Sequence, residues 1–238
     1  MKGEYGMKFG VIVFPGANCD RDIAYILQDI LHQPTQMIWH EESDLSDVDV
    51  VVVPGGFSYG DYLRCGAIAQ FSPAMQATAE HAKQGKLVMG ICNGFQVLTE
   101  MGLLPGALVR NRDLHFVCDR IPLTVERNDT PWTQGYQTGQ TITLPIAHGE
   151  GCYFADPDTL KSLEDNNQIL FRYCDAAGNA TDAANPNGSL NSIAGICNPA
   201  GNVLGMMPHP ERAADAALGN TDGLALFEGL LQSAMAVA

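Results

Sequence analysis

The sequence is poor in basic residues and has no long apolar run. Its 238 residues include 13 lysines and arginines against 27 aspartates and glutamates, which gives a formal net charge of −14. Nucleic acids and anionic membrane surfaces attract basic proteins, so this balance argues against both as partners. No stretch approaches the ~18 consecutive apolar residues of a membrane span. We therefore expect neither a nucleic acid nor a membrane among the partners of this chain.

Several motifs are missing as well. The seven cysteines form no Cys-x-x-Cys pair, and the apolar run at 9–14 is too short for a secretory signal. Both observations predict a cytoplasmic protein in a reducing compartment. The histidines lack metal-ligand spacing, which argues against a metal site. No glycine-rich turn reads GxxxxGK(S/T) or GxGxxG, so the sequence gives no support for ATP binding by this chain.

The first half of the chain alternates strand and helix patterns. Apolar, β-branched runs predict buried strands at 8–14, 36–39, 47–53 and 86–89. One helix follows Asn18 or Asp20, either of which can cap it, and another runs over 73–84. This alternation predicts an α/β fold with one doubly wound, mostly parallel sheet and flanking helices. Ligands in such folds bind beyond the carboxyl ends of the strands.

The second half changes character without a linker that would divide the chain. Short β patterns predict additional antiparallel strands beside the parallel sheet, at 108–109, 117–125, 141–146, 169–173, 192–197 and 203–207. Residues 175–189 are polar and rich in Asn, Asp and Gly, which predicts an exposed loop. Residues 222–236 predict a closing amphipathic helix. We expect a single domain.

Cys92 is the strongest candidate for chemistry. It lies in a Gly-x-Cys-x-Gly turn, after an apolar strand pattern and before a helical one. Such a strand-to-helix turn exposes a nucleophile, and the helix start stabilises a thiolate. Far along the chain, a Met-Pro-His-Pro-Glu-Arg run supplies His209 as a base and Glu211 as the group that orients it. Cys19 also precedes a predicted helix, but it lacks the glycine turn and is the weaker nucleophile candidate.

GxCxGxQ combined with a distant His-Pro-Glu resembles the triad-type glutamine amidotransferases. In these enzymes cysteine, histidine and glutamate hydrolyse the side-chain amide of glutamine. Four further segments are similar to the glutaminase subunits of phosphoribosylformylglycinamidine synthase, a purine-synthesis enzyme: residues 8–22, 54–67, 144–151 and 207–212. The resemblance implies a glutamine amidotransferase domain over 7–238. Residues 1–6 are then expected to be an extension or a tag remnant.

The resemblance also implies roles for individual residues. Cys92 forms a thioester, His209 shuttles protons and Glu211 fixes the imidazole. Backbone N–H groups bind the oxyanion, and the expected donors are Gly56, Phe57 and Asn93. The residues expected to bind glutamine are Gln96, His148, Gly149 and Glu150.

The resembled enzyme consumes ATP, which this chain has no motif to bind. The resemblance therefore implies that ATP and magnesium lie on a large synthetase subunit, and that a very small subunit bridges the two. Three alternatives stay open: a stand-alone γ-glutamyl or cysteine hydrolase, a glutaminase of another synthetase, and a non-catalytic scaffold. The mark of a scaffold is a lost triad member, and all three members are present.

Overall fold

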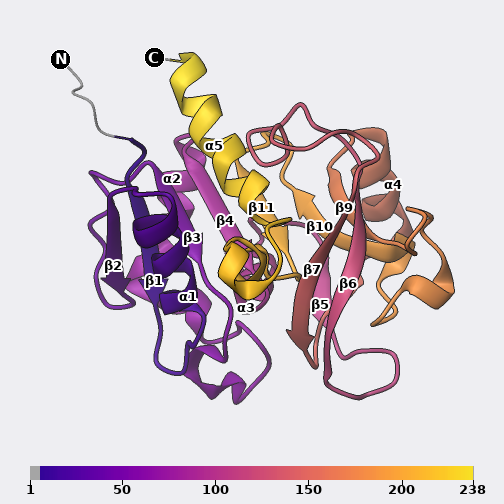
Figure 1. The fold of residues 1–238 in the computed structure, drawn as a ribbon. Coiled ribbons are helices and arrows are strands. Elements are labelled where there is room, and N and C mark those ends of the chain that lie inside the picture. The colour runs from indigo at the N-terminus through magenta and orange to yellow at the C-terminus, as the bar shows by residue number, and fades with distance from the viewer. Residues whose placement is uncertain (1–5, 238) are drawn as a thin grey trace.

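Short apolar runs build the sheet at the centre of the fold. The computed structural model describes residues 6–237, so the expected extension at 1–6 lies, apart from Gly6, outside the described residues. Nine strands form one sheet in the order β2-β1-β3-β4-β11-β10-β9-β6-β7 (Figure 1). Their bounds are β1 Phe9–Val13, β2 Thr35–Trp39, β3 Val50–Val53, β4 Leu87–Ile91, β6 Val117–Val125, β7 Thr141–His148, β9 Ile169–Tyr173, β10 Ile193–Cys197 and β11 Val203–Met206.

The direction of the strands divides the sheet into two parts. Strands β2, β1, β3, β4 and β11 pair in parallel, whereas β11, β10, β9, β6 and β7 pair antiparallel. The four valines of β3 are all buried, as expected for a parallel strand covered on both faces. The predicted fold class, a doubly wound sheet extended by antiparallel strands, is confirmed.

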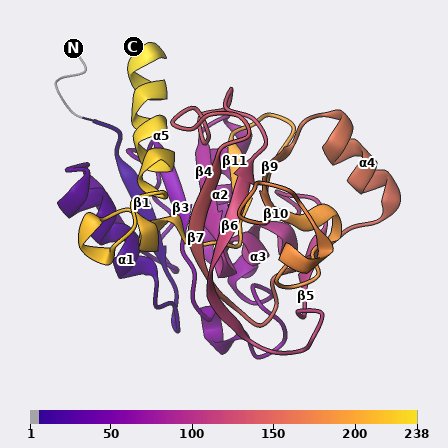
Figure 2. The same ribbon diagram turned by 45° about the vertical axis from the view of Figure 1, so that its right-hand side comes forward.

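Helices cover both faces of the sheet. Helices α1 and α5 lie on one face, and α2 and α3 lie on the other, as the two views show (Figures 1 and 2). Connections between parallel strands are right-handed, so the direction of a step along the sheet decides which face its helix covers. The step from β1 to β2 runs toward one edge of the sheet and the step from β3 to β4 runs toward the other, so α1 and α2 cover opposite faces. The helix bounds are α1 Asp20–Tyr25, α2 Pro73–Lys83, α3 Asn93–Glu100, α4 Pro157–Asp165 and α5 Leu224–Val237. None of the helices described here is long and apolar enough to cross a membrane.

Several local features differ from the sequence-based expectations, and the first is that β11, expected among the antiparallel strands, pairs in parallel with β4. The N-cap of α1 is Cys19, with no side-chain cap, so the predicted cap by Asn18 or Asp20 is wrong. This helix continues as a π-helix over Ile26–Ile30. Helix α4 was not predicted, although Asp156 caps it by accepting two backbone N–H groups. Two further strands, β5 Ala107–Val109 and β8 Cys152–Phe154, form a separate small sheet.

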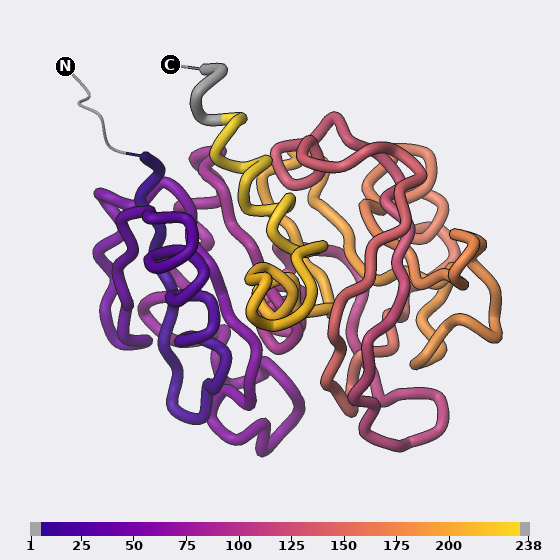
Figure 3. The backbone as a smooth tube through the Cα atoms, viewed as in Figure 1, coloured from indigo at the N-terminus to yellow at the C-terminus, as the bar shows by residue number. Residues whose placement is uncertain are grey.

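One edge of the sheet collects the loops that carry the candidate residues. The carboxyl ends of β1, β3, β4 and β7 lead into loops at the lower edge of Figure 3, and the start of β1 and the body of α5 lie at the opposite edge. Cys92 follows β4 directly, and residues 54–57 follow β3. Chain segments that are far apart in sequence therefore meet at this edge, as the doubly wound fold requires.

The packing of α3 against β3 yields a stability prediction. A Cβ on Gly94 would lie 1.9 Å from the carbonyl oxygen of Val53, which is backbone and cannot yield easily. Overpacking costs about 1–3 kcal/mol, so Gly94→Ala is expected to lower the Tm by roughly 2–12 °C. Gly149→Ala is the control, because its Cβ would meet only Phe116, at 3.7 Å. Equal melting temperatures for the two variants by calorimetry would contradict this account.

Candidate active site

Cys92 occupies a strained turn between β4 and α3. Its backbone has φ 50° and ψ −106°, a conformation that L-residues rarely adopt. The flanking glycines allow the turn, because a Cβ on Gly90 would lie 2.7 Å from the carbonyl oxygen of Gly94. The Cys92 N–H donates to the Met206 carbonyl at 2.8 Å, which ties the turn to β11. The side chain is thus presented at the start of α3, as in the nucleophile elbows of hydrolases.

His209 and Glu211 form a buried pair beyond the end of β11. His209 Nδ1 and Glu211 Oε1 are 2.6 Å apart, and each residue is only 1% exposed. The His209 N–H donates to the Pro145 carbonyl at 2.8 Å, which fixes this segment to β7. His209 Nε2 is buried and has no hydrogen-bond partner within residues 6–237. That nitrogen is therefore available to exchange a proton with a nucleophile or a substrate.

Gly55 marks the point where these groups converge. A Cβ on Gly55 would lie 2.8 Å from Cε1 of His209, 3.2 Å from Sγ of Cys19 and 3.4 Å from Cβ of Cys92. The chain therefore brings the three residues around one glycine, where no side chain fits. The sequence-predicted nucleophile and base are brought together by the fold.

The buried pair controls the charge of the histidine. Burial disfavours the imidazolium, but the negative charges of Glu211 and then Cys92 outweigh it and raise the pKa of His209 well above its ordinary value. A protonated imidazole in turn favours the thiolate form of a neighbouring cysteine. The arrangement places a protonated imidazole beside Cys92, as nucleophilic catalysis by a cysteine requires.

Two of the predicted oxyanion donors, Gly56 and Phe57, lie in the turn after β3, and the third, Asn93, follows Cys92 at the start of α3. Gly56 has φ 134°, and a Cβ there would lie 2.7 Å from the backbone nitrogen of Asn18. The Asn93 N–H belongs to the first turn of α3, whose N–H groups have no partner inside the helix. The Phe57 N–H, however, donates to the Gly16 carbonyl at 3.2 Å. Phe57 therefore has to leave Gly16 before its N–H can bind an oxyanion.

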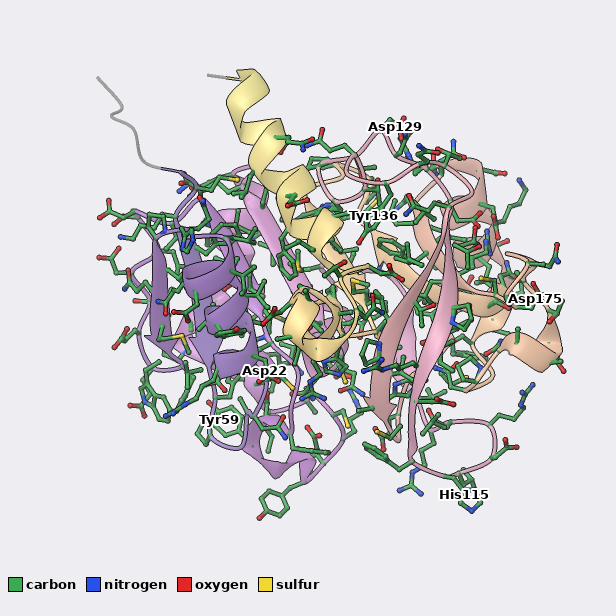
Figure 4. All side chains as sticks on the ribbon, in the orientation of Figure 1. Asp22, Tyr59, His115, Asp129, Tyr136 and Asp175 are labelled. Atoms are coloured by element: carbon green, nitrogen blue, oxygen red, sulfur yellow. The ribbon has the colours of Figure 1, made fainter. Side chains whose placement is uncertain are left out.

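Hydrogen bonds anchor the loop that contains Phe57. The Tyr59 hydroxyl lies 2.6 Å from Nδ1 of His40, and the Ser58 N–H donates to Oδ1 of Asn93 at 3.0 Å. Figure 4 shows Tyr59 and His115 on two separate loops at the lower edge of the molecule. The first loop is thus connected directly to the cysteine turn through the Asn93 side chain, a contact that the sequence did not suggest.

A single cavity of about 130 Å³ contains most of the predicted site. This volume is below the roughly 300–1,000 Å³ of pockets for drug-sized ligands, so it suits an amino acid rather than a nucleotide. The predicted residues Asn93 and Glu211 do not line the cavity, but they bond to Gln96 and His209, which do. The predicted residues that line the cavity are Gly56, Phe57, Cys92, Gln96, His148, Gly149, Glu150 and His209.

Gln96 supports the cavity wall through its side-chain amide. Its Nε2 donates to the Glu150 carbonyl at 2.6 Å, and its Oε1 accepts from Nδ2 of Asn93 at 2.9 Å. Both ends of the amide are therefore engaged with the chain. In this structure Gln96 fixes the backbone of Glu150, in addition to lining the cavity where it was predicted to bind glutamine.

Two buried asparagines hold residues 148–151, which we call the HGEG turn. Asn111 donates to the His148 carbonyl at 2.8 Å and accepts from the Gly151 N–H at 3.0 Å. Asn187 donates to the Gly151 carbonyl at 2.8 Å and lies 3.0 Å from Nε2 of His148. Sequence reasoning missed both residues, because asparagines in polar segments usually indicate turns.

The prediction that 175–189 is an exposed loop is wrong for its last part. Asn185, Asn187 and Ser189 are buried, and Asn187 is fully inaccessible. Hydrogen bonds of Asn187 and Ser189 to Gly151, and of Asn185 to Ser189, replace the water that these polar groups would otherwise need. A segment with a loop-like composition therefore forms part of the site.

Cys19 lies inside the same site. Its Sγ accepts from Nη2 of Arg212 at 3.1 Å, and Nε of Arg212 donates to Oδ2 of Asp22 at 3.1 Å. Ligand atoms of Cys19, His209 and Glu211 lie within 4.8 Å of one another. The guanidinium beside Cys19 and the Glu211–His209 bond both disfavour a cation there. We therefore interpret this group as polar packing around the base.

Cys65 also lines the cavity, but its environment suppresses reactivity. Burial, followed by the negative charge of Asp61, raises the pKa of the Cys65 thiol far above its ordinary value. A protonated thiol is a poor nucleophile. Cys65 is therefore no rival to Cys92.

Comparisons with known proteins agree with this geometry. Residues 7–222 match the family of CobB/CobQ-like glutamine amidotransferase domains. The match covers most of the chain, and the chain belongs to this family of glutamine amidotransferases.

Relatives narrow the identification within the family. A protein of Acaryochloris marina, named phosphoribosylformylglycinamidine synthase subunit PurQ, is 73% identical over 97% of this chain and 98% of its own length. The protein of the same name from Synechocystis is 72% identical over 92% of this chain and 98% of its own length. A chain in the structure of PurLQS from Thermotoga maritima has a TM-score of 0.84 and 42% identity, over 96% of this chain and 99% of that one. The predicted resemblance to the glutaminase subunit of this synthase is confirmed.

The proximity of Cys19 to His209 makes covalent labelling a decisive test of the nucleophile. We expect a glutamine-like chloroketone or diazoketone to modify Cys92 first, because only Cys92 is on the strained turn at the helix start. Peptide mapping after partial labelling measures this order. Free glutamine should protect Cys92, whereas exposed Cys118 serves as the control for nonspecific alkylation. Predominant labelling of Cys19 would reassign the nucleophile.

Proposed function

We propose that Cys92, His209 and Glu211 hydrolyse the side-chain amide of glutamine to glutamate and ammonia. With this activity the chain serves as the glutaminase subunit of phosphoribosylformylglycinamidine synthase. The observation that carries the proposal is the strained Cys92 turn, which meets a buried His209–Glu211 pair at an amino-acid-sized cavity. The names of the relatives support the same conclusion.

The reaction starts at the amide carbon of glutamine. The Cys92 thiolate forms a bond to this carbon, and the carbonyl oxygen takes the negative charge, which the N–H groups of Gly56 and Asn93 stabilise. His209 then gives its proton to the leaving amide nitrogen, so that ammonia departs and a glutamyl thioester remains. Neutral His209 next removes a proton from water, which attacks the thioester and releases glutamate and the Cys92 thiolate. Glu211 holds the imidazole orientation throughout.

The ammonia has to reach an acceptor on another subunit. We assign ATP, magnesium and the formylglycinamide ribonucleotide to a large synthetase subunit, and we expect a very small bridging subunit in the complex. The cavity of about 130 Å³ at Cys92 suits glutamine rather than a ribonucleotide, so the acceptor has to bind elsewhere. The Thermotoga maritima relative was solved as PurLQS, which supports partner subunits. All seven cysteines are free, which supports the cytoplasmic location.

The three alternative functions predict different observations. A stand-alone γ-glutamyl or cysteine hydrolase would turn over rapidly without a partner. A glutaminase of another synthetase is disfavoured by relatives of 73% and 72% identity that are named for this synthase. A scaffold protein has no need for the strained Cys92 backbone or for a buried His209–Glu211 pair.

Variants of the triad separate glutamine hydrolysis from the ammonia-dependent synthesis on the partner subunit. We expect Cys92→Ala to abolish glutaminase activity and His209→Ala to come close to doing so. Glu211→Gln should be milder, because losing the carboxylate of a triad costs less than losing the base, and the amide oxygen can still accept from Nδ1 of His209. Synthesis driven by added ammonia should survive in all three variants. Loss of ammonia-driven synthesis in Cys92→Ala would contradict the proposed division of labour.

The Phe57–Gly16 hydrogen bond predicts coupling to the partner. Because the Phe57 N–H is engaged at 3.2 Å, we expect weak glutaminase activity for the isolated chain. Activity should rise when the synthetase is loaded with nucleotide and ribotide, by up to the ~10²–10³-fold effect of one oxyanion donor. The measurement is glutamate release by the chain alone, with the empty partner and with the loaded partner. Equal turnover in the three cases would favour the stand-alone hydrolase instead.

A further inference from the structure

The side-chain amide of Asn187 has only one orientation that its neighbours permit. Its Oδ1 accepts from the Ser189 N–H at 3.0 Å, and its Nδ2 donates to the Gly151 carbonyl at 2.8 Å. A backbone N–H can only donate and a carbonyl can only accept, so exchanging the amide oxygen and nitrogen would break both bonds. The nitrogen of Asn187 is therefore a donor on the side that faces His148.

This orientation fixes the tautomer of His148. Nδ2 of Asn187 lies 3.0 Å from Nε2 of His148 and 3.3 Å from the Tyr173 hydroxyl. Its two protons go to the Gly151 carbonyl and to the nearer of these two atoms, Nε2, which must then carry a lone pair. A neutral imidazole carries one proton, which must then be on Nδ1. Burial, followed by the positive charge of His209, lowers the pKa of His148 to about 4, so the ring is neutral near pH 7. His148 is thus an N–H donor through Nδ1.

Nδ1 of His148 lies on the side of the ring opposite the edge that contacts the HGEG turn. A Cβ on Gly151 would lie 2.1 Å from Cδ2 and 2.3 Å from Nε2 of His148, so that edge of the ring packs against the HGEG turn. Nδ1 is the ring atom opposite this edge. It is buried, and it has no hydrogen-bond partner in the described part of the chain. His148 also lines the cavity that contains Cys92 and His209.

A buried donor without an acceptor is unfavourable, which indicates that a ligand supplies the acceptor. We propose that Asn187 is a positioning residue that keeps the proton on Nδ1 of His148, so that His148 donates a hydrogen bond to an oxygen of the bound glutamine. This inference rests on the proposed glutaminase function. A neutral donor is well suited to this place, because a second cation would repel protonated His209.

Asn187→Asp tests the tautomer through pH. An aspartate accepts but cannot donate, so it pulls the His148 proton to Nε2 and raises the pKa of the ring. Below the raised pKa both nitrogens carry protons and the Nδ1 donor survives; above it the proton stays on Nε2 and the donor is lost. We therefore expect kcat/KM for glutamine in the assembled synthase to fall with rising pH in Asn187→Asp, in a step that the unmodified protein lacks.

Asn185→Asp is the matched control for Asn187→Asp. Asn185 is buried in the same segment and donates to the Ser189 carbonyl at 2.8 Å, and none of its hydrogen bonds reaches His148. It should show no new pH step. Nitrogen NMR of the imidazole reports the tautomer directly, with the proton on Nδ1 in the unmodified protein and on Nε2 in Asn187→Asp near pH 8. An Nε2 proton in the unmodified protein would overturn the proposal.

Replacing His148 keeps the proposal testable if Asn187→Asp does not fold. An asparagine amide reaches the position of Nδ1, whereas a glutamine amide reaches that of Nε2. His148→Asn should therefore retain most of the glutaminase kcat/KM, and His148→Gln should lose about 10²-fold, as for other preorganised donors. Equal losses in both would overturn the donor role. Cys92→Ala separates failure of this inference from failure of the proposed function, because glutaminase activity retained in Cys92→Ala would contradict the proposed function itself.

Discussion

The strained backbone of Cys92 is the constraint on which the rest of the site depends. A φ of 50° at a non-glycine residue costs on the order of 1–3 kcal/mol and persists only where the surroundings enforce it. Here β4 is held between β3 and β11, and Gly94 packs so closely on Val53 that an added Cβ would overlap the Val53 carbonyl oxygen. The pairing of β11 with β4 also delivers His209 to the same edge. The order of the strands therefore determines both the strained turn at Cys92 and the position of His209 beside it.

The charges of the site are arranged around a single buried imidazole. Glu211 stabilises the cationic form of His209 against the cost of burying that charge. The other polar groups that line the cavity combine the ionisable side chains of Asp61, Glu150 and Arg212 with neutral amides and backbone groups, and the neutral groups add hydrogen bonds without further charge. Such preorganised dipoles cost no reorganisation when the charge moves from sulfur to the substrate oxygen.

The HGEG turn illustrates how neutral side chains hold the backbone of the site in place. Asn111 and Asn187 both bind the backbone of the turn, one from the segment after β5 and the other from the segment after β9. An asparagine presents a donor and an acceptor at once, so it can satisfy a carbonyl and an N–H of the turn in a buried place. A charged side chain would require a counter-charge next to His209.

The sequence by itself determined four of the five parallel strands, the cysteine turn and the candidate triad, because each follows from a local pattern, whereas the parallel pairing of β11 with β4 was not foreseen. Valine runs such as 50–53 specify buried strands, and glycines at fixed spacing around Cys92 permit only a sharp turn. Asn187, the position of Cys19 and the engaged N–H of Phe57 were decided only by the tertiary structure. Their partners lie up to 193 residues away, and a polar segment is buried or exposed according to which distant groups the fold places beside it.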